Sequence, residues 1–158
     1  MKSLEETTFA VIGLGLIGGS YAKALKNRKA HRIIGMDRNH IVSLMAKDEG
    51  YITDIADENP SLLQEADIII CAIYPGGFVS FVKDHVKDFK KDVLLTDVMG
   101  IKGSIPDEID RLWDRKWILS RLIRWPDGKA KDMVKVPPGF SKGRISFSSS
   151  AKEIGRKT

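Results

Sequence analysis

Seven residues near the N-terminus have the spacing of a phosphate-binding turn. The run Gly13-Leu-Gly15-Leu-Ile-Gly18-Gly19 follows a short apolar stretch and precedes apolar residues at helical spacing. In such a turn Gly13 permits the tight bend, Gly15 lets the backbone approach a pyrophosphate, and Gly18 lets the helix pack closely on the strand. The helix N-terminus then offers unpaired N–H groups to the phosphates. The pattern predicts dinucleotide binding, against the alternative that the glycines only permit packing.

An acidic residue follows where it would bind the sugar of such a nucleotide. Asp37 ends the second apolar run, 19 residues beyond Gly18, and a carboxylate there can accept both hydrogens of a ribose diol. It also repels the extra phosphate of NADP, so Asp37 favours NAD. Arg38 can stack on adenine or reach a 2′-phosphate, which keeps NADP as the alternative cofactor.

The other reactive side chains carry weaker signals. His31, His40 and His85 lack metal-like spacing, so structural or solvent-exposed roles are favoured and no metal site is predicted. The single cysteine, Cys71, lies in the most apolar run, where a buried, inert thiol is expected. The segment from Tyr74 to Gly77 follows that run, and both a cofactor-facing loop and a plain turn fit it.

Apolar runs alternate with helical stripes and would position these residues. We expect strands at 9–12, 32–36, 67–72 and 92–96, and helices at 16–27, 41–45, 77–89 and after 104. Run 67–72 is continuously apolar, as in an interior parallel strand. Ser104-Ile-Pro-Asp107 matches a capping box. The alternation predicts a doubly wound, Rossmann-type parallel α/β sheet.

Length and charge narrow the class of protein. The 158 residues suffice for one compact domain, and the longest apolar stretch, 68–74, is too short to cross a membrane. Residues 1–8 do not form a basic and then apolar leader, so we expect a soluble, cytoplasmic protein. The first 110 residues carry a net charge of −4 and the last 48 carry +9, with all three tryptophans. A solvated tail and a nucleic-acid-binding arm are both typical of such basicity.

Residues 8–112 resemble the prephenate dehydrogenase family, which includes arogenate dehydrogenases. The resemblance rests on residues 11–20, 34–39, 66–75 and 96–103, of which the last two segments together are the more specific. It implies NAD(P)-dependent oxidative decarboxylation of prephenate to 4-hydroxyphenylpyruvate, in tyrosine biosynthesis. The small-molecule substrate would be prephenate or arogenate, and family members are homodimers.

The resemblance also implies roles for individual residues. The dinucleotide would be held by Gly13, Gly15, Leu16, Ile17, Gly18, Asp37 and Arg38. Tyr74, Pro75 and Asp97 would lie near its nicotinamide half. Lys102 matches a family lysine of the substrate loop, whereas Gly100 stands where some members have a serine that binds the substrate hydroxyl.

The resemblance ends after Leu112. The family continues into a His-Pro-Met-Ala-Gly segment with the catalytic histidine, and then into a helical domain that completes the substrate pocket and the dimer. Neither is visible in this sequence. We therefore expect a dinucleotide-binding domain at 1–112, a basic tail at 113–158, no intact catalytic residue, and a chain that is close to inactive.

A frame slip would explain the tail. Ile123-Arg-Trp-Pro-Asp127 can be encoded ATC CGA TGG CCG GAC, and one base earlier, after a C, the triplets CAT CCG ATG GCC GGA encode His-Pro-Met-Ala-Gly. In the same frame, residues 128–132 can give Arg-Glu-Gly-Lys-Gly, which also resembles the family. We therefore hypothesise a slip between Arg111 and Arg121 and an out-of-frame, poorly ordered tail, for which nucleic acid is not the expected partner.

Two other functions stay open. One is a nucleotide-binding regulatory module whose basic tail binds nucleic acid, which a salt-sensitive gel shift would detect. The other is a different small dehydrogenase of the same fold that acts on a hydroxy acid.

Overall fold

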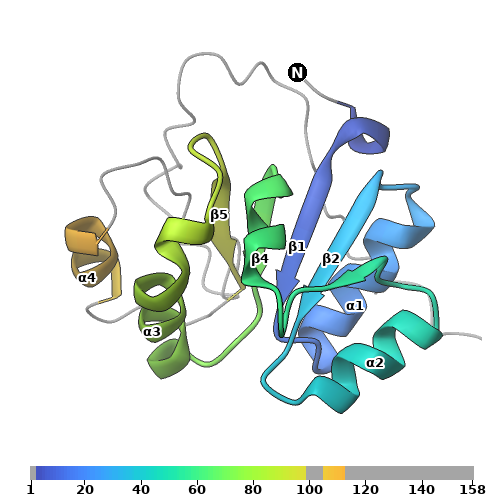
Figure 1. Cartoon of the computed structure of the whole chain (residues 1–158), viewed down its shortest axis with the longest axis horizontal. Helices are drawn as coiled ribbons and strands as arrows, with labels where there is room; N and C mark the ends of the chain where they lie inside the picture. The colour runs from blue at the N-terminus through green and yellow to red at the C-terminus, as the bar shows by residue number, and fades with distance from the viewer. Residues whose placement is uncertain (1–2, 99–104, 113–158) are drawn as a thin grey trace, which may run out of the picture.

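The computed structural model describes residues 3–98 and 105–112. The expected tail at 113–158 and Ser104 of the expected capping box lie outside them. Within the described residues, five parallel strands form one sheet in the order β3-β2-β1-β4-β5 (Figure 1). The strands are β1 (Thr8–Ile12), β2 (Arg32–Met36), β3 (Asp54–Ile55), β4 (Ile68–Cys71) and β5 (Leu94–Asp97). The structure confirms the predicted Rossmann-type α/β sheet.

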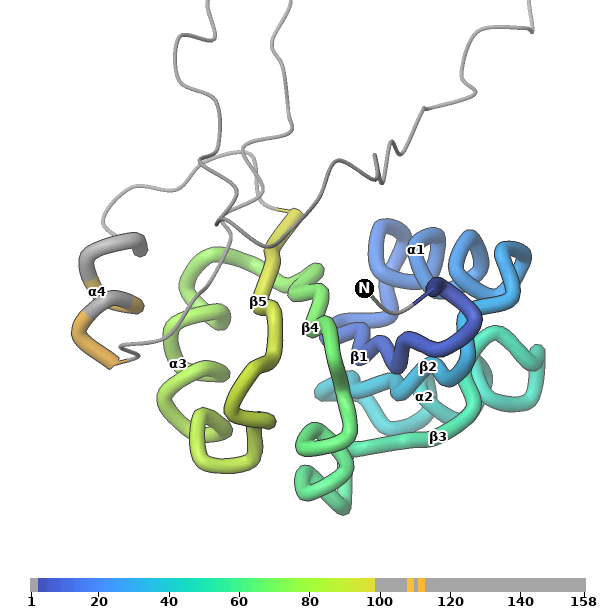
Figure 2. Tube along the Cα trace, turned by 90° about the horizontal axis from the view of Figure 1, so that it is seen from above, coloured from blue at the N-terminus to red at the C-terminus, as the bar shows by residue number. Residues whose placement is uncertain are grey.

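Helices and 3₁₀ turns connect the strands. The helices are α1 (Leu16–Asn27), α2 (His40–Asp48), α3 (Pro75–His85) and α4 (Ile105–Leu112), and the 3₁₀ turns are η1 (Leu4–Glu6), η2 (Pro60–Glu65) and η3 (Val86–Asp88). Seen from above, α1 and α2 lie near β1 and β2, whereas α3 lies beside β4 and β5 (Figure 2). In the described part of the chain, no helix combines the length and apolar character needed to cross a bilayer.

Several elements differ from the sequence-based expectation. Helix α3 ends at residue 85 instead of 89, α2 covers 40–48 instead of 41–45, and β5 covers 94–97 instead of 92–96. β3 was not predicted, because it has only two residues and gains its strand geometry by pairing with Ile34 and Gly35 of β2. Helix α3 begins at Pro75 instead of Gly77, since proline fits the first helical position, where no N–H is needed. Tyr74 is therefore the N-cap of α3, and residues 75–77 form its first turn instead of a separate loop.

The residues of β1 supply both faces of the sheet. Phe9 and Val11 pack into a cluster with residues of α1 and α2, whereas Ala10 and Ile12 pack into a second cluster with residues of α3. All five residues of β1 are buried, because helices cover both faces of this central strand. The two clusters fix β1 in place, and β1 in turn fixes the start of the glycine turn that follows it.

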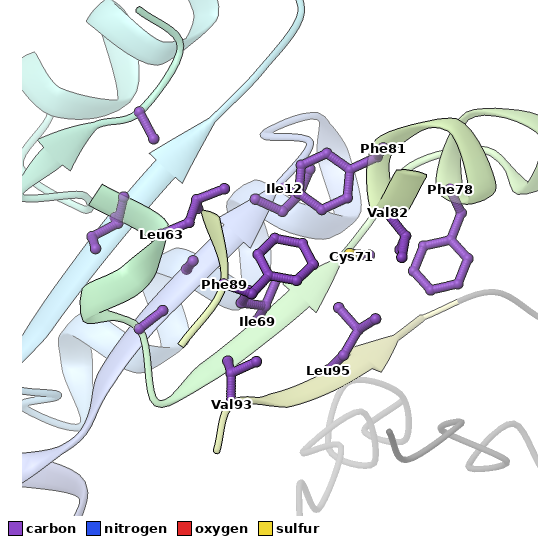
Figure 3. Packing of buried hydrophobic residues seen from close by; sticks show 14 of the residues in the cluster. Ile12, Leu63, Ile69, Cys71, Phe78, Phe81, Val82, Phe89, Val93 and Leu95 are labelled. Carbon is purple, nitrogen blue, oxygen red and sulfur yellow. The ribbon is translucent and has the colours of Figure 1, made fainter. Parts of the chain in front are cut away.

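The second cluster holds α3 against β4 and β5. Phe78 and Val82 of α3 are fully buried, four residues apart on one helix face. The rings of Phe81 and Phe89 lie 5.8 Å apart between centroids, and Figure 3 shows Phe89 next to Ile69 of β4. Each such side chain contributes about 1.5–3 kcal/mol by leaving water. This packing positions the N-terminus of α3 at the carboxyl end of β4.

Candidate functional site

The carboxyl ends of β1 and β4 form the switch point of the sheet. From β1 the chain crosses to β2 on one side, and β4 pairs with β1 on the other side. Connections therefore leave these two strands in opposite directions, and ligands of open α/β sheets bind in the crevice that results. The glycine turn follows β1, and the start of α3 follows β4.

Two of the three pattern glycines are required by the protein itself. Gly13 has φ +84°, and a Cβ there would lie 2.5 Å from the carbonyl oxygen of Ala72. A Cβ on Gly18 would lie 1.7 Å from the carbonyl oxygen of Gly13, so α1 packs directly on the turn. These two glycines are explained by the bend and by close packing.

Gly15 has no such explanation within the described chain. Its φ of −66° is open to any residue, and a Cβ there would have no heavy atom within 4 Å. Gly15 is also the N-cap of α1, which has no side-chain cap. The first intrahelical bond runs from the Gly19 N–H to the Gly15 carbonyl over 2.8 Å, so the amides before it have no partner within the helix. A glycine here suits a ligand that must approach the backbone, and the site fits a phosphate group.

The Asp37 carboxylate is bound to the same turn. Its Oδ2 accepts a hydrogen bond from the Leu14 N–H over 2.8 Å, and its Oδ1 accepts one from the Asn39 N–H over 2.8 Å. A carboxylate has about four acceptor positions, so two remain after these bonds. They match in number the two hydroxyls of a ribose, and the carboxylate lies beside the turn that would hold the phosphates.

Exposed apolar side chains flank the carboxyl ends of β1 and β4. Leu16 is 94% exposed, Ile17 57% and Tyr74 89%, although Leu and Ile are usually buried. Leu16 and Ile17 form the start of α1, and Tyr74 is the N-cap of α3, with Pro75 following it. Arg38 is exposed beside Asp37. A flat organic ligand at the carboxyl ends of β1 and β4 would cover this surface.

Asp97 lies deeper at the same edge. Its side chain is 1% exposed, and Cys71 is its register partner on the neighbouring strand. Burial raises the pKa of the Cys71 thiol well above its usual value, and the charge of Asp97 raises that pKa further. Cys71 is thus a buried thiol that stays protonated, as expected from its apolar run. Gly100 and Lys102, the expected substrate residues, lie outside the described residues.

One histidine, His40, lies next to the segment that carries Asp37, whereas His85 lies at the far end of α3. His40 is the first residue of α2, and its Nδ1 lies 2.8 Å from Oδ2 of Asp57. His85 ends α3 and pairs with Asp88 over 3.2 Å. Among residues 3–98 and 105–112, no three His, Cys, Asp or Glu side chains gather as metal ligands. Sequence reasoning missed Asp57, because it follows the short strand β3, which leaves no apolar run to mark it.

A family model and a curated relative both point to prephenate dehydrogenase. Residues 21–121 match the family model described as prephenate dehydrogenase, nucleotide-binding domain. The chain is 34% identical over 114 residues to prephenate dehydrogenase of Bacillus subtilis strain 168, which covers 71% of this chain and 30% of that enzyme. The chain thus spans less than a third of the length of this relative.

Solved structures share the fold. Synechocystis arogenate dehydrogenase is similar with a TM-score of 0.62 and 28% identity, covering 67% of this chain and 37% of that one. Prephenate dehydrogenase from A. aeolicus, solved in complex with hydroxyphenyl propionate and NAD+, gives a TM-score of 0.67 at 22% identity, covering 75% and 42%. At 22% identity, the similarity to the A. aeolicus enzyme shows that the two chains share a fold and no more.

Proposed function

The chain belongs to the prephenate dehydrogenase family, whose nucleotide-binding domain it contains, and from this premise we propose that it binds NAD in the crevice between β1 and β4. The observation that carries the proposal is the bond between the Leu14 N–H and the Asp37 carboxylate, which joins the phosphate turn to the ribose acid. The open space over Gly15 supports the same placement. The A. aeolicus relative with NAD+ bound has the same fold.

Each part of the crevice has a role in this proposal. The turn at Gly13 and Gly15 and the first amides of α1 bind the pyrophosphate, and the helix dipole favours its negative charge. Asp37 accepts hydrogen bonds from the ribose hydroxyls and disfavours a 2′-phosphate, which makes NAD the preferred cofactor and NADP the weaker one. The exposed side chains of Leu16 and Tyr74 cover the bound molecule and exclude water from it.

The parent reaction would be the oxidation of prephenate or arogenate. Bound NAD supplies a hydride acceptor, and the substrate loses carbon dioxide as its ring becomes aromatic. Tyr74, Pro75 and Asp97 lie at the edge where the nicotinamide half would reach, and we assign them to that half. Gly100 and Lys102 would contact the substrate. The similarity to prephenate and arogenate dehydrogenases supports this class of substrate.

We further propose that the present chain is inactive because of a frame slip. The three histidines of the sequence all precede residue 86, so a His-Pro-Met-Ala-Gly segment is not encoded in the present frame. The family match ends at residue 121, at the limit of the interval 111–121 in which we place the slip. Without its histidine the reaction would lose about 10²–10⁴-fold in general-base catalysis.

Three experiments test these proposals. Calorimetric titration of the full chain with NAD+ and with NADP+ tests the cofactor, and we expect binding of NAD+ with weaker or undetected binding of NADP+. Absence of NAD+ binding at millimolar concentration would contradict the proposal. Sequencing the DNA beyond codon 105 tests the frame slip, because a frame that spells the histidine segment must be present there. A steady-state assay with prephenate and NAD+ should then give turnover at least about 10²-fold below that of a frame-corrected chain.

A further inference from the structure

Asp57 holds the segment that carries the ribose acid. Its Oδ1 accepts a hydrogen bond from the Asp37 N–H over 2.9 Å, and its Oδ2 lies 2.8 Å from Nδ1 of His40. The side chain of Asp57 is 8% exposed, whereas that of His40 is 43% exposed. One buried carboxylate thus contacts both ends of the turn that leads from β2 into α2.

The backbone keeps Asp57 at this position. The Ala56 N–H donates to the Gly35 carbonyl over 2.9 Å, which extends the pairing of β3 with β2 up to the residue before Asp57. Asp57 therefore reaches Asp37 from the segment that follows β3. The Asn39 side chain caps α2 by accepting from the Ile41 N–H. The turn is fixed by β3 on one side and by its own cap on the other.

These contacts point to a role in cofactor binding. The Asp37 side chain accepts from the Leu14 N–H while its own backbone N–H donates to Asp57, so one residue joins the turn after β1 to the Asp57 carboxylate. Because Asp57 accepts from that backbone and also holds His40, its loss would free the Asp37 carboxylate to move. Binding energy depends on such preorganisation, since an ordered acceptor pair avoids an entropic cost on binding.

We propose that Asp57, with His40, is a positioning residue that orients Asp37 for the adenosine ribose of the dinucleotide. Asp57 acts through Asp37 and does not itself contact the ligand. This inference rests on the proposed NAD site and assigns a further residue to it. The sequence motif ends at Asp37, so the contribution of Asp57 comes from the three-dimensional contacts alone.

A double-mutant cycle tests the proposal. In the full chain, Asp57→Ala should raise the Kd for NAD+ about tenfold, because charged hydrogen-bond acceptors are lost. In an Asp37→Ala background, the same substitution should change the Kd less than twofold. Asp57→Asn keeps one acceptor oxygen for the Asp37 N–H and should restore most of the affinity. An equal loss in both backgrounds, or an unchanged Kd in the single variant, would overturn the proposal.

A matched control separates positioning from stability. Asp54→Ala removes the same charge three residues before Asp57, on β3, and breaks an ion pair with Arg32, 2.7 Å long, away from the turn. We expect it to lower the melting temperature and to leave the Kd for NAD+ within twofold. A tenfold rise in Kd in this control would assign the Asp57 effect to general destabilisation.

Amide exchange distinguishes this proposal from the proposal of NAD binding. In the unliganded full chain, Asp57→Ala should accelerate hydrogen exchange at the Asp37 and Leu14 N–H groups by at least tenfold relative to the Ala72 N–H. Unchanged exchange at both amides would overturn the positioning role even if NAD+ binds. If Asp57→Ala accelerates exchange at the Asp37 and Leu14 N–H groups but the chain does not bind NAD+, the contact made by Asp57 is supported. The proposed nucleotide site is then refuted.

Discussion

The Leu14 N–H donates to Oδ2 of Asp37 over 2.8 Å, so the turn after β1 and the end of β2 form one hydrogen-bonded unit. Gly13 reinforces this unit, because its N–H donates to the Met36 carbonyl over 2.7 Å. The amides proposed to bind phosphate and the carboxylate proposed to bind ribose are thereby held at a fixed separation. The proposed cofactor site is preorganised, and this preorganisation determines the predictions below.

Replacing Asp37 by alanine removes the acceptor of two backbone amides as well as the proposed ribose ligand. We expect a loss of about 1–3 kcal/mol in the free energy of unfolding, measured in urea, because the two amides lose a charged partner. The Kd for NAD+ should rise at least tenfold, and the preference for NAD+ over NADP+ should shrink, because the repelling charge is gone. Asp84→Ala, an exposed change of the same charge on α3, should alter neither quantity.

Substitution of the glycines should separate ligand binding from folding. Gly15→Ala should keep the free energy of unfolding within about 1 kcal/mol, since its φ and its surroundings accept a methyl group. It should nevertheless weaken NAD+ binding at least tenfold. Gly18→Ala should cost about 3 kcal/mol or more, because its Cβ would overlap the Gly13 carbonyl. Thermal unfolding and calorimetry measure both effects, and a stable Gly18→Ala variant would contradict the described packing.

The buried thiol predicts a loss of stability in alkali. The pKa of Cys71 is raised in the folded chain, so its contribution is complete below its unfolded pKa of about 9 and is lost as the pH rises toward the folded value. Above pH 9 the free energy of unfolding should therefore fall by about 1.4 kcal/mol per pH unit more in the wild type than in Cys71→Ala. Equal slopes, or rapid labelling of the native thiol at pH 8, would show that Cys71 is accessible.

The Arg32–Asp54 pair predicts a loss of stability in acid. The hydrogen bond from Arg32 lowers the pKa of Asp54 below its usual 3.8, so its contribution is present above that pH and is lost as the pH falls through the lower, folded value. Since Asp54 is about a third exposed, we expect Asp54→Asn to cost about 0.5–1 kcal/mol at pH 7. The difference from the wild type should shrink below pH 3.8. A constant difference across this range would exclude an ionic origin.

Much of this fold could be predicted from local patterns. β1, β2, β4 and β5 have apolar runs, and the strong regularity of α1 fixed its bounds at residues 16–27. β3 could not be predicted, because two residues with partly buried side chains give no periodic signal. The start of α3 was misplaced, since Gly76 and Gly77 favour a turn locally, whereas the buried face at Phe78 and Val82 selects a helix.

Part of the candidate site could be predicted from the sequence, and part depends on contacts between distant residues. The glycine pattern and Asp37 are adjacent in any such motif, so their proximity followed from the sequence. Asp57 and His40 could not be placed there, because their contact depends on the pairing of β3 with β2, which brings together residues 17 positions apart. The open space around a Cβ on Gly15 distinguishes this glycine from Gly13 and Gly18, where a Cβ would clash. This difference depends on the folded structure and could not be predicted from the glycine pattern.

Chemical-shift mapping of the ¹⁵N-labelled full chain with NAD+ tests the central claim most directly. The backbone amides of residues 14–17 and 37 should shift progressively as NAD+ is added, because they line the proposed pyrophosphate and ribose positions. Amides near Asp67 and Lys90, at the opposite edge of the sheet, should stay in place. Shifts confined to that opposite edge, or no shifts at millimolar NAD+, would contradict a nucleotide site between β1 and β4.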